Sequence, residues 1–130
     1  MSSFAVVNLL DLEDATGGRA PGIEGRFARS HLDSRDLGVS IFHYAASVRS
    51  PIAHKHGVQE EVYIVVAGSG RALLDGGVHE LRQWDVLRVA PEVVRAFEAG
   101  ADGLELIAVG SARPEEGDGE MGEAAWPSGE

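Results

Sequence analysis

Residues 54–68 read His-Lys-His-Gly-Val-Gln-Glu-Glu-Val-Tyr-Ile-Val-Val-Ala-Gly. Side chains alternate between the two faces of a strand, so His54 and His56 share one face and Lys55 points the other way. After a gap long enough for a tight turn, Glu61 begins a second strand. Both faces of that strand are largely apolar, which predicts that both are covered. The stretch therefore predicts two adjacent strands whose polar side chains converge.

Further short apolar segments lie on either side of this pair, bounded by Gly, Pro and Asp. Such spacing is typical of an antiparallel sandwich or barrel, so we expect an all-β protein. Asp75-Gly76-Gly77 is predicted to be a hairpin turn, because glycine tolerates the positive φ that hairpins require. Gly68-Ser69-Gly70 is also predicted to be a turn between strands. The expected strands are Gly38–Ala46, Glu61–Ala67, Arg71–Leu74, Asp85–Val89, Val93–Glu98 and Leu104–Val109.

Length and composition indicate one small domain. The chain has 130 residues, 44% of them hydrophobic, and no cysteine. A core of this size rarely divides, and without cysteine neither a disulfide nor a thiolate ligand is available. The N-terminus has no basic region followed by a long apolar stretch, so it does not resemble a signal peptide. The longest apolar run, Val62 to Ala67, is far shorter than a membrane helix. We therefore expect a cytoplasmic protein that does not enter a membrane.

The net charge of −10 is unevenly distributed. Half of it comes from residues 111–130, where six acidic residues face one arginine, Arg113. A tail of Gly, Glu, Ser and Pro buries little surface and is expected to stay loose, except where the large ring of Trp126 docks. An acidic chain with no basic stripe argues against nucleic acid and anionic membranes as partners. A small molecule is the expected partner.

The His54, His56 and Glu61 side chains form a candidate metal site. Two imidazoles and a carboxylate suit a divalent first-row metal and leave positions open for a substrate or oxygen. This donor set does not distinguish iron, manganese, nickel, copper or zinc. A His-x-His pair by itself is commonly a surface feature. Here the following glutamate and the apolar strand favour a site.

The spacing His54-x-His56-x4-Glu61-x6-Gly68 resembles the first motif of the cupin superfamily, and residues 77–97 resemble its second motif. The resemblance covers about residues 38–110 and is nearest to small single-domain bacterial cupins without an assigned activity. It implies a jelly-roll β-barrel in a single domain. We therefore assign residues 38–110 to the barrel core. Residues 1–37 form a segment of strand and loop packing on the barrel, and residues 111–130 form a flexible acidic tail.

Several motif positions depart from the cupin pattern. Val48, Trp84 and Val93 replace glycines and Ala99 replaces an asparagine, but the largest change is Arg95, which stands where the fourth ligand, usually histidine, is expected. A guanidinium has no lone pair to donate to a metal. Arg95 could clamp an anionic substrate beside a three-ligand metal, because its planar fork matches carboxylate and phosphate oxygens. It could instead pair with Glu61 and replace the metal, or it could reach solvent at the barrel mouth.

Two function hypotheses follow for the pocket. In the first, the barrel binds a divalent metal at His54, His56 and Glu61 and a small anionic molecule near Arg95, Tyr63 and Phe97, and it could be a metal-dependent enzyme. In the second, it is a metal-free ligand-binding or sensing module. The sequence does not decide whether turnover occurs. The outward apolar face of Val62, Ile64 and Val66 indicates a homodimer.

Overall fold

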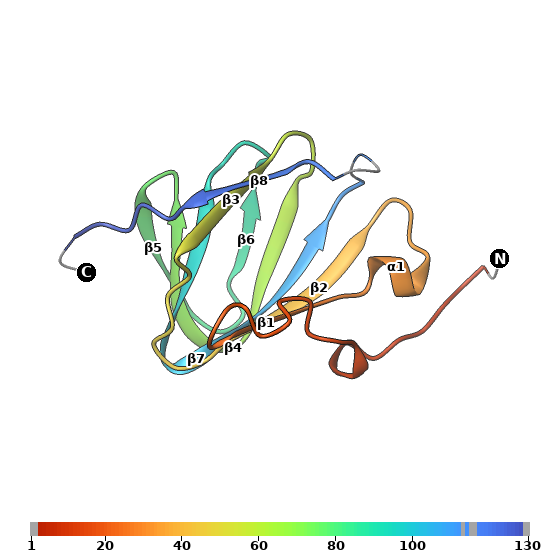
Figure 1. Cartoon of the computed structure of the whole chain (residues 1–130), viewed down its shortest axis with the longest axis horizontal. Coiled ribbons are helices and arrows are strands. Elements are labelled where there is room, and N and C mark those ends of the chain that lie inside the picture. The colour runs from red at the N-terminus through yellow and green to blue at the C-terminus, as the bar shows by residue number, and fades with distance from the viewer. Residues whose placement is uncertain (1–2, 113, 115–116, 129–130) are drawn as a thin grey trace.

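The structure is a computed structural model that describes residues 3–112, 114 and 117–128. In this part of the chain eight strands form one antiparallel sheet, which curls into an open half-barrel (Figure 1). A 3-10 turn, η1 (Leu9–Asp11), and a short helix, α1 (Arg29–Leu32), complete the fold. The strands are β1 (Ile23–Phe27), β2 (Gly38–Tyr44), β3 (Ile52–His56), β4 (Glu61–Leu74), β5 (Gly77–Leu81), β6 (Val86–Val89), β7 (Arg95–Gly110) and β8 (Gly119–Glu123).

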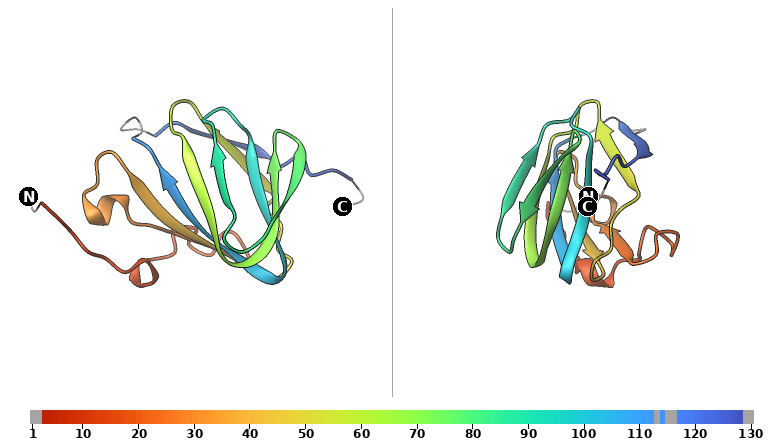
Figure 2. Two further views of the ribbon diagram at one scale, coloured as in Figure 1. Left: turned by 180° about the vertical axis from the view of Figure 1, so that it is seen from behind. Right: turned by 90° about the vertical axis from the view of Figure 1, so that its left-hand side faces the viewer.

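The strands make two facing walls. The order β1-β2-β7-β3-β8 forms one path, and β4 joins this path through β7 and carries β5 and β6 beside it. Viewed from its end, the sheet places β4, β5 and β6 opposite β3 and β8 (Figure 2). Antiparallel pairing and the curled sheet agree with the predicted all-β jelly roll. Among the described residues, no helix is long and apolar enough to span a membrane.

The long strands β4 and β7 each join two segments that were predicted to be separate strands. The predicted turn at residues 68–70 is wrong, because β4 continues through it with shifts in register against β7. Gly68 has φ +73° there, and a Cβ atom on it would lie 2.0 Å from the carbonyl oxygen of Gly103. The glycines thus permit an irregular crossing of two strands rather than a chain reversal.

The predicted hairpin at Asp75 is confirmed. Leu74 pairs with Gly77, which leaves Asp75 and Gly76 as the two loop residues. Both have positive φ, 48° and 85°, as the tightest hairpin turns require. This turn joins β4 to β5 and so fixes the register between these two strands.

The barrel interior holds the main hydrophobic core. Its inward side chains come from both walls, as the alternation of a strand predicts. One buried residue is exceptional, since Arg95 has an exposed fraction of 0%. The buried members of the main cluster are Tyr44, Tyr63, Val65, Ala72, Leu81, Val89, Phe97, Ala99, Leu104, Leu106 and Ala108.

The C-terminal segment differs from the loose tail that was expected. Residues 119–123 form β8, which pairs with β3 along its whole length (Figure 1). Beyond β8, the indole Nε1 of Trp126 donates to the carbonyl oxygen of Ser50 at 2.8 Å, and the Arg49 guanidinium lies 4.6 Å from the ring centroid. The expected docking of Trp126 is therefore present. Backbone pairing requires no apolar side chains, so composition gave little sign of β8. The acidic residues Glu115, Glu116 and Glu130, with Arg113, lie outside the described residues.

Candidate metal centre

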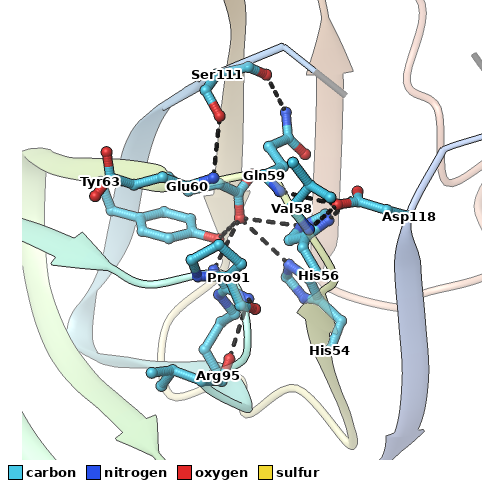
Figure 3. A network of polar contacts seen from close by, with 12 residues as sticks. His54, His56, Val58, Gln59, Glu60, Tyr63, Pro91, Arg95, Ser111 and Asp118 are labelled. Carbon is cyan, nitrogen blue, oxygen red and sulfur yellow. Dashed lines mark hydrogen bonds and ion pairs between the residues drawn. The ribbon is translucent and has the colours of Figure 1, made fainter. Parts of the chain in front are cut away.

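Three predicted ligands converge at one end of the barrel. His54 and His56 project inward from β3 (Figure 3). Glu61 is the first residue of β4 and lines the same cavity. The Nε2 atoms of His54 and His56 lie 3.6 and 3.4 Å from Oε1 of Glu61. One donor atom from each residue falls within 4.8 Å of the others. Metal–ligand bonds of roughly 2.0–2.2 Å place neighbouring donors about 3–3.6 Å apart. The two distances to Glu61 therefore fit a divalent cation.

The carboxylate of Glu61 is the electrostatic centre of this group. Its Oε1 accepts a short hydrogen bond from the Tyr63 hydroxyl. Burial alone raises the pKa of Glu61, but the neighbouring imidazoles of His54 and His56 and the hydrogen bond from Tyr63 outweigh it and hold the pKa below its ordinary value. The pKa of Tyr63 lies well above its ordinary value because the ring is buried and its hydroxyl faces this carboxylate. Glu61 is therefore an anion and Tyr63 a neutral donor at neutral pH.

A further carboxylate supports His56 from the opposite side. Nδ1 of His56 lies 2.9 Å from Oδ1 of Asp118 (Figure 3). Oδ2 of Asp118 accepts from the backbone N–H groups of Val58 and Gln59, at 2.7 and 2.9 Å. Burial alone raises the pKa of Asp118, yet these two N–H donors and His56 together lower it. The imidazole of His56 thus lies between two carboxylates.

A cavity of about 610 Å³ adjoins the three ligands. The end of the cavity beside these three residues is polar, and Gln59 and Tyr63 lie there with His54, His56 and Glu61. The remaining wall combines an apolar part with the polar residues Arg29, Ser30, Asp33, Ser34 and Ser40. It includes Phe97, the second of the two aromatic residues predicted for the pocket, whose ring centroid lies 4.8 Å from that of Tyr63. The other apolar lining residues are Phe27, Val39, Phe42, Tyr44, Leu106, Ala108 and Met121.

Similar folds occur among solved structures. A cupin protein from Bacteroides fragilis superposes with a TM-score of 0.70 at 25% identity, over 88% of this chain and 89% of that one. The Streptomyces protein PAC13, solved as a variant with uridine, gives a TM-score of 0.73 at 14% identity over 91% and 90%. A salicylate 1,2-dioxygenase from Pseudaminobacter salicylatoxidans gives 0.61 at 18% identity, over 72% of this chain and 27% of the dioxygenase. No protein-family model and no curated protein matches the chain.

The chain is a small cupin-fold protein. Trp84, which replaces one of the motif glycines, keeps the backbone conformation of a glycine. Trp84 has φ +74°, a left-handed conformation that favours glycine. Its side chain is 68% exposed, so the ring is accommodated in solvent.

Arg95 does not reach solvent at the barrel mouth, which overturns that interpretation. Its Nη1 donates to the carbonyl oxygen of Pro91 at 3.2 Å (Figure 3) and to that of Val93 at 3.0 Å. Its Nη2 donates to the carbonyl oxygen of Ala90 at 3.4 Å. Nη2 also lies 3.7 Å from Oε1 of Glu61. Among the described residues, Arg95 is outside the set that lines the cavity. The structure therefore gives its fork no open surface for clamping an anion.

Two polar residues at the site, Asp118 and Gln59, were not predicted from the sequence. Asp118 belongs to the acidic tail and lies 62 positions from His56, so no local spacing links them. Gln59, only 6% exposed, donates from Nε2 to the carbonyl oxygen of Ser111 and lines the cavity. His43, left unassigned in the sequence, lies away from the site, with Nδ1 3.3 Å from Glu105.

Proposed function

We propose that this cupin binds a divalent transition metal through His54, His56 and Glu61, and a small molecule in the adjoining cavity. The observation that carries the proposal is the convergence of three donor atoms within 4.8 Å, with the far nitrogen of His56 already engaged by Asp118. Metal-binding histidines regularly donate their second ring N–H to a carboxylate. The donor types suit iron, manganese, nickel, copper or zinc.

The cavity supports a ligand that places a polar group beside the proposed metal and an apolar body along the aromatic side chains. The polar end would lie beside Glu61 and Tyr63, and the body would contact rings such as Phe42 and Phe97. Three protein ligands leave open positions on a metal, and an anionic oxygen of the ligand suits such a position. The open metal positions are therefore the reason for proposing an anionic ligand. Arg95 no longer supplies that reason, because its guanidinium is engaged by backbone carbonyls.

A bound metal would supply Lewis acidity toward such an oxygen. The chain's own residues have defined tasks around it. The Tyr63 hydroxyl donates to Oε1 of Glu61 and so holds the carboxylate in one orientation. The apolar wall, including Phe97, excludes water from the body of the ligand. A protein with these features could catalyse a reaction. Metal binding and ligand binding are tested before catalysis.

A metal-free ligand-binding or sensing module is the second candidate. The observation that favours it is the 3.7 Å approach of the Arg95 Nη2 to Oε1 of Glu61. In this alternative the guanidinium neutralises Glu61, and the cavity binds its ligand by shape and by hydrogen bonds alone. Both candidates use the same cavity, so the metal content of the native protein separates them.

Metal analysis of protein purified without a histidine tag tests the proposal. The apoprotein would be reconstituted in turn with each of the five metals and assayed by elemental analysis and thermal unfolding. A metal at 100 times its Kd stabilises the native state by about 2.7 kcal/mol, which corresponds to a rise in Tm of about 10 °C for a domain of this size. The His54→Ala, His56→Ala double variant should show neither binding nor the rise.

The matched control is His43→Ala, His79→Ala, which removes two exposed histidines. It should bind metal and gain stability as the wild type does. If the wild type takes up no stoichiometric metal from any of the five, the metal proposal is wrong and the metal-free module replaces it. Equal metal uptake by both double variants would also overturn the ligand assignment.

A further inference from the structure

The carboxylate of Asp118 has every feature of a group that orients a neighbour. Its side chain is 8% exposed, and both oxygens are engaged. Oδ1 contacts Nδ1 of His56 at 2.9 Å, while Oδ2 accepts two backbone N–H groups from the turn between β3 and β4. A carboxylate fixed by two N–H donors cannot rotate without losing them. Oδ1 is therefore held in one direction, toward Nδ1 of His56.

The segment that follows Asp118 is itself fixed at both ends. Immediately after Asp118, β8 pairs residue by residue with β3, with His56 opposite Gly119 and His54 opposite Met121 (Figure 1). At the far end, the Trp126 indole is anchored on Ser50 and Arg49, just before β3 begins. The acidic segment thus lies along the whole strand that presents both histidines.

This contact decides which nitrogen of His56 can act as a ligand. A neutral imidazole carries one N–H and one lone pair. A carboxylate beside Nδ1 accepts a hydrogen bond and so favours the tautomer with the proton on Nδ1. The lone pair is then on Nε2, the atom that faces Glu61 at 3.4 Å. We propose that Asp118 is a positioning residue that holds His56 in the Nδ1–H tautomer with Nε2 directed to the metal. As regards the metal, this inference rests on the proposed function.

The chemistry of Asp118 makes a graded test possible. Asparagine keeps one carbonyl oxygen, so it can accept from Nδ1 of His56, but its amide nitrogen would then face the N–H donors of Val58 and Gln59. Asp118→Asn should therefore keep the tautomer and weaken the anchoring. Asp118→Ala removes both. Glu120→Gln, on exposed β8 two residues away, removes the same charge without touching His56 and serves as the control.

Two measurements follow the variants. Long-range ¹⁵N NMR of the metal-free protein, at a pH where the imidazoles are neutral, reports the tautomer of His56. Titration with Zn²⁺ or Co²⁺ reports the affinity. We expect the Nδ1–H form in the wild type, Glu120→Gln and Asp118→Asn, and a mixture in Asp118→Ala. Metal affinity should fall about 10- to 100-fold in Asp118→Ala, less in Asp118→Asn, and not at all in Glu120→Gln.

The outcomes separate this inference from the proposed function. If the wild type binds no metal but Asp118→Ala changes the tautomer, the positioning role stands and the metal proposal falls. If the wild type binds metal and Asp118→Ala matches it in both tautomer and affinity, the inference about Asp118 is wrong. Thermal unfolding of each variant identifies one that fails to fold, and Asp118→Asn then decides through its affinity. An Asp118→Asn affinity equal to that of the wild type would overturn the inference in that case.

Discussion

Replacing Arg95 with methionine should destabilise the metal-free protein by about 3 kcal/mol. Methionine fills the buried volume but cannot donate to the carbonyl oxygens of Pro91 and Val93, which Nη1 reaches at 3.2 and 3.0 Å. A hydrogen bond from a charged donor contributes about 1.5 kcal/mol or more, so two such bonds give about 3 kcal/mol. The bond to Ala90, at 3.4 Å, is long and adds little.

Urea unfolding in the presence of a chelator measures this loss. Arg88→Met is the matched control, because Arg88 is 66% exposed and its pair with Glu60 should contribute less than 1 kcal/mol. The same Arg95→Met change in a Glu61→Gln background separates the backbone bonds from the ion pair. We expect at least 2 kcal/mol of the loss to persist there. If the loss of stability disappears when Glu61 is neutralised, the ion pair with Glu61 holds Arg95 and the carbonyl oxygens of Pro91 and Val93 do not. The reasoning is then refuted.

Three other predictions concern the site, the surface and the pH response. Arg95→His should bind metal more tightly than the wild type, because a repelling charge is removed and an imidazole is added; unchanged affinity in a Zn²⁺ titration would show that residue 95 does not face the metal. The outward face of Val62, Ile64 and Val66 is proposed to form a homodimer interface, so sedimentation should give a dimer, and a monomer at high micromolar concentration would contradict it. Burial alone raises the pKa of Glu98, but hydrogen bonds from Arg71 and Arg49 outweigh it and hold the pKa below its ordinary value. Glu98 therefore stabilises the fold above its unfolded pKa of about 4.5, and this stabilisation is lost as the pH falls through the lower folded pKa. Unfolding curves between pH 3 and 7 should show a smaller pH dependence in Glu98→Gln, whereas an unchanged dependence would exclude that role.

The parts of this fold that could be predicted from the sequence are those fixed by short-range geometry. Alternation along a strand placed His54 and His56 on one face, and Asp75-Gly76-Gly77 specified a two-residue hairpin. The same kind of signal failed at Gly68-Ser69-Gly70, because glycines that permit a turn also permit an irregular strand crossing. There, the partner that decides is Gly103, 35 positions away, whose carbonyl occupies the space a side chain would need. The contact between Asp118 and His56 could not be predicted for the same reason, since only the tertiary structure brings the two residues together.

Arg95 shows how a missing ligand could be predicted although its consequence could not. Its position in the stretch that resembles the second cupin motif predicts that a fourth donor is absent, because a guanidinium has no lone pair. Which of its three roles it takes depends on the carbonyls of residues 90–93, whose direction no pattern encodes. These carbonyls engage both terminal nitrogens, and the approach to Glu61, at 3.7 Å, is longer than a hydrogen bond. The guanidinium thus has its own partners, and Oε1 of Glu61 stays directed at both imidazoles. For this reason we place the metal ahead of the metal-free alternative, and we expect the nearby charge to weaken its binding relative to a four-ligand site.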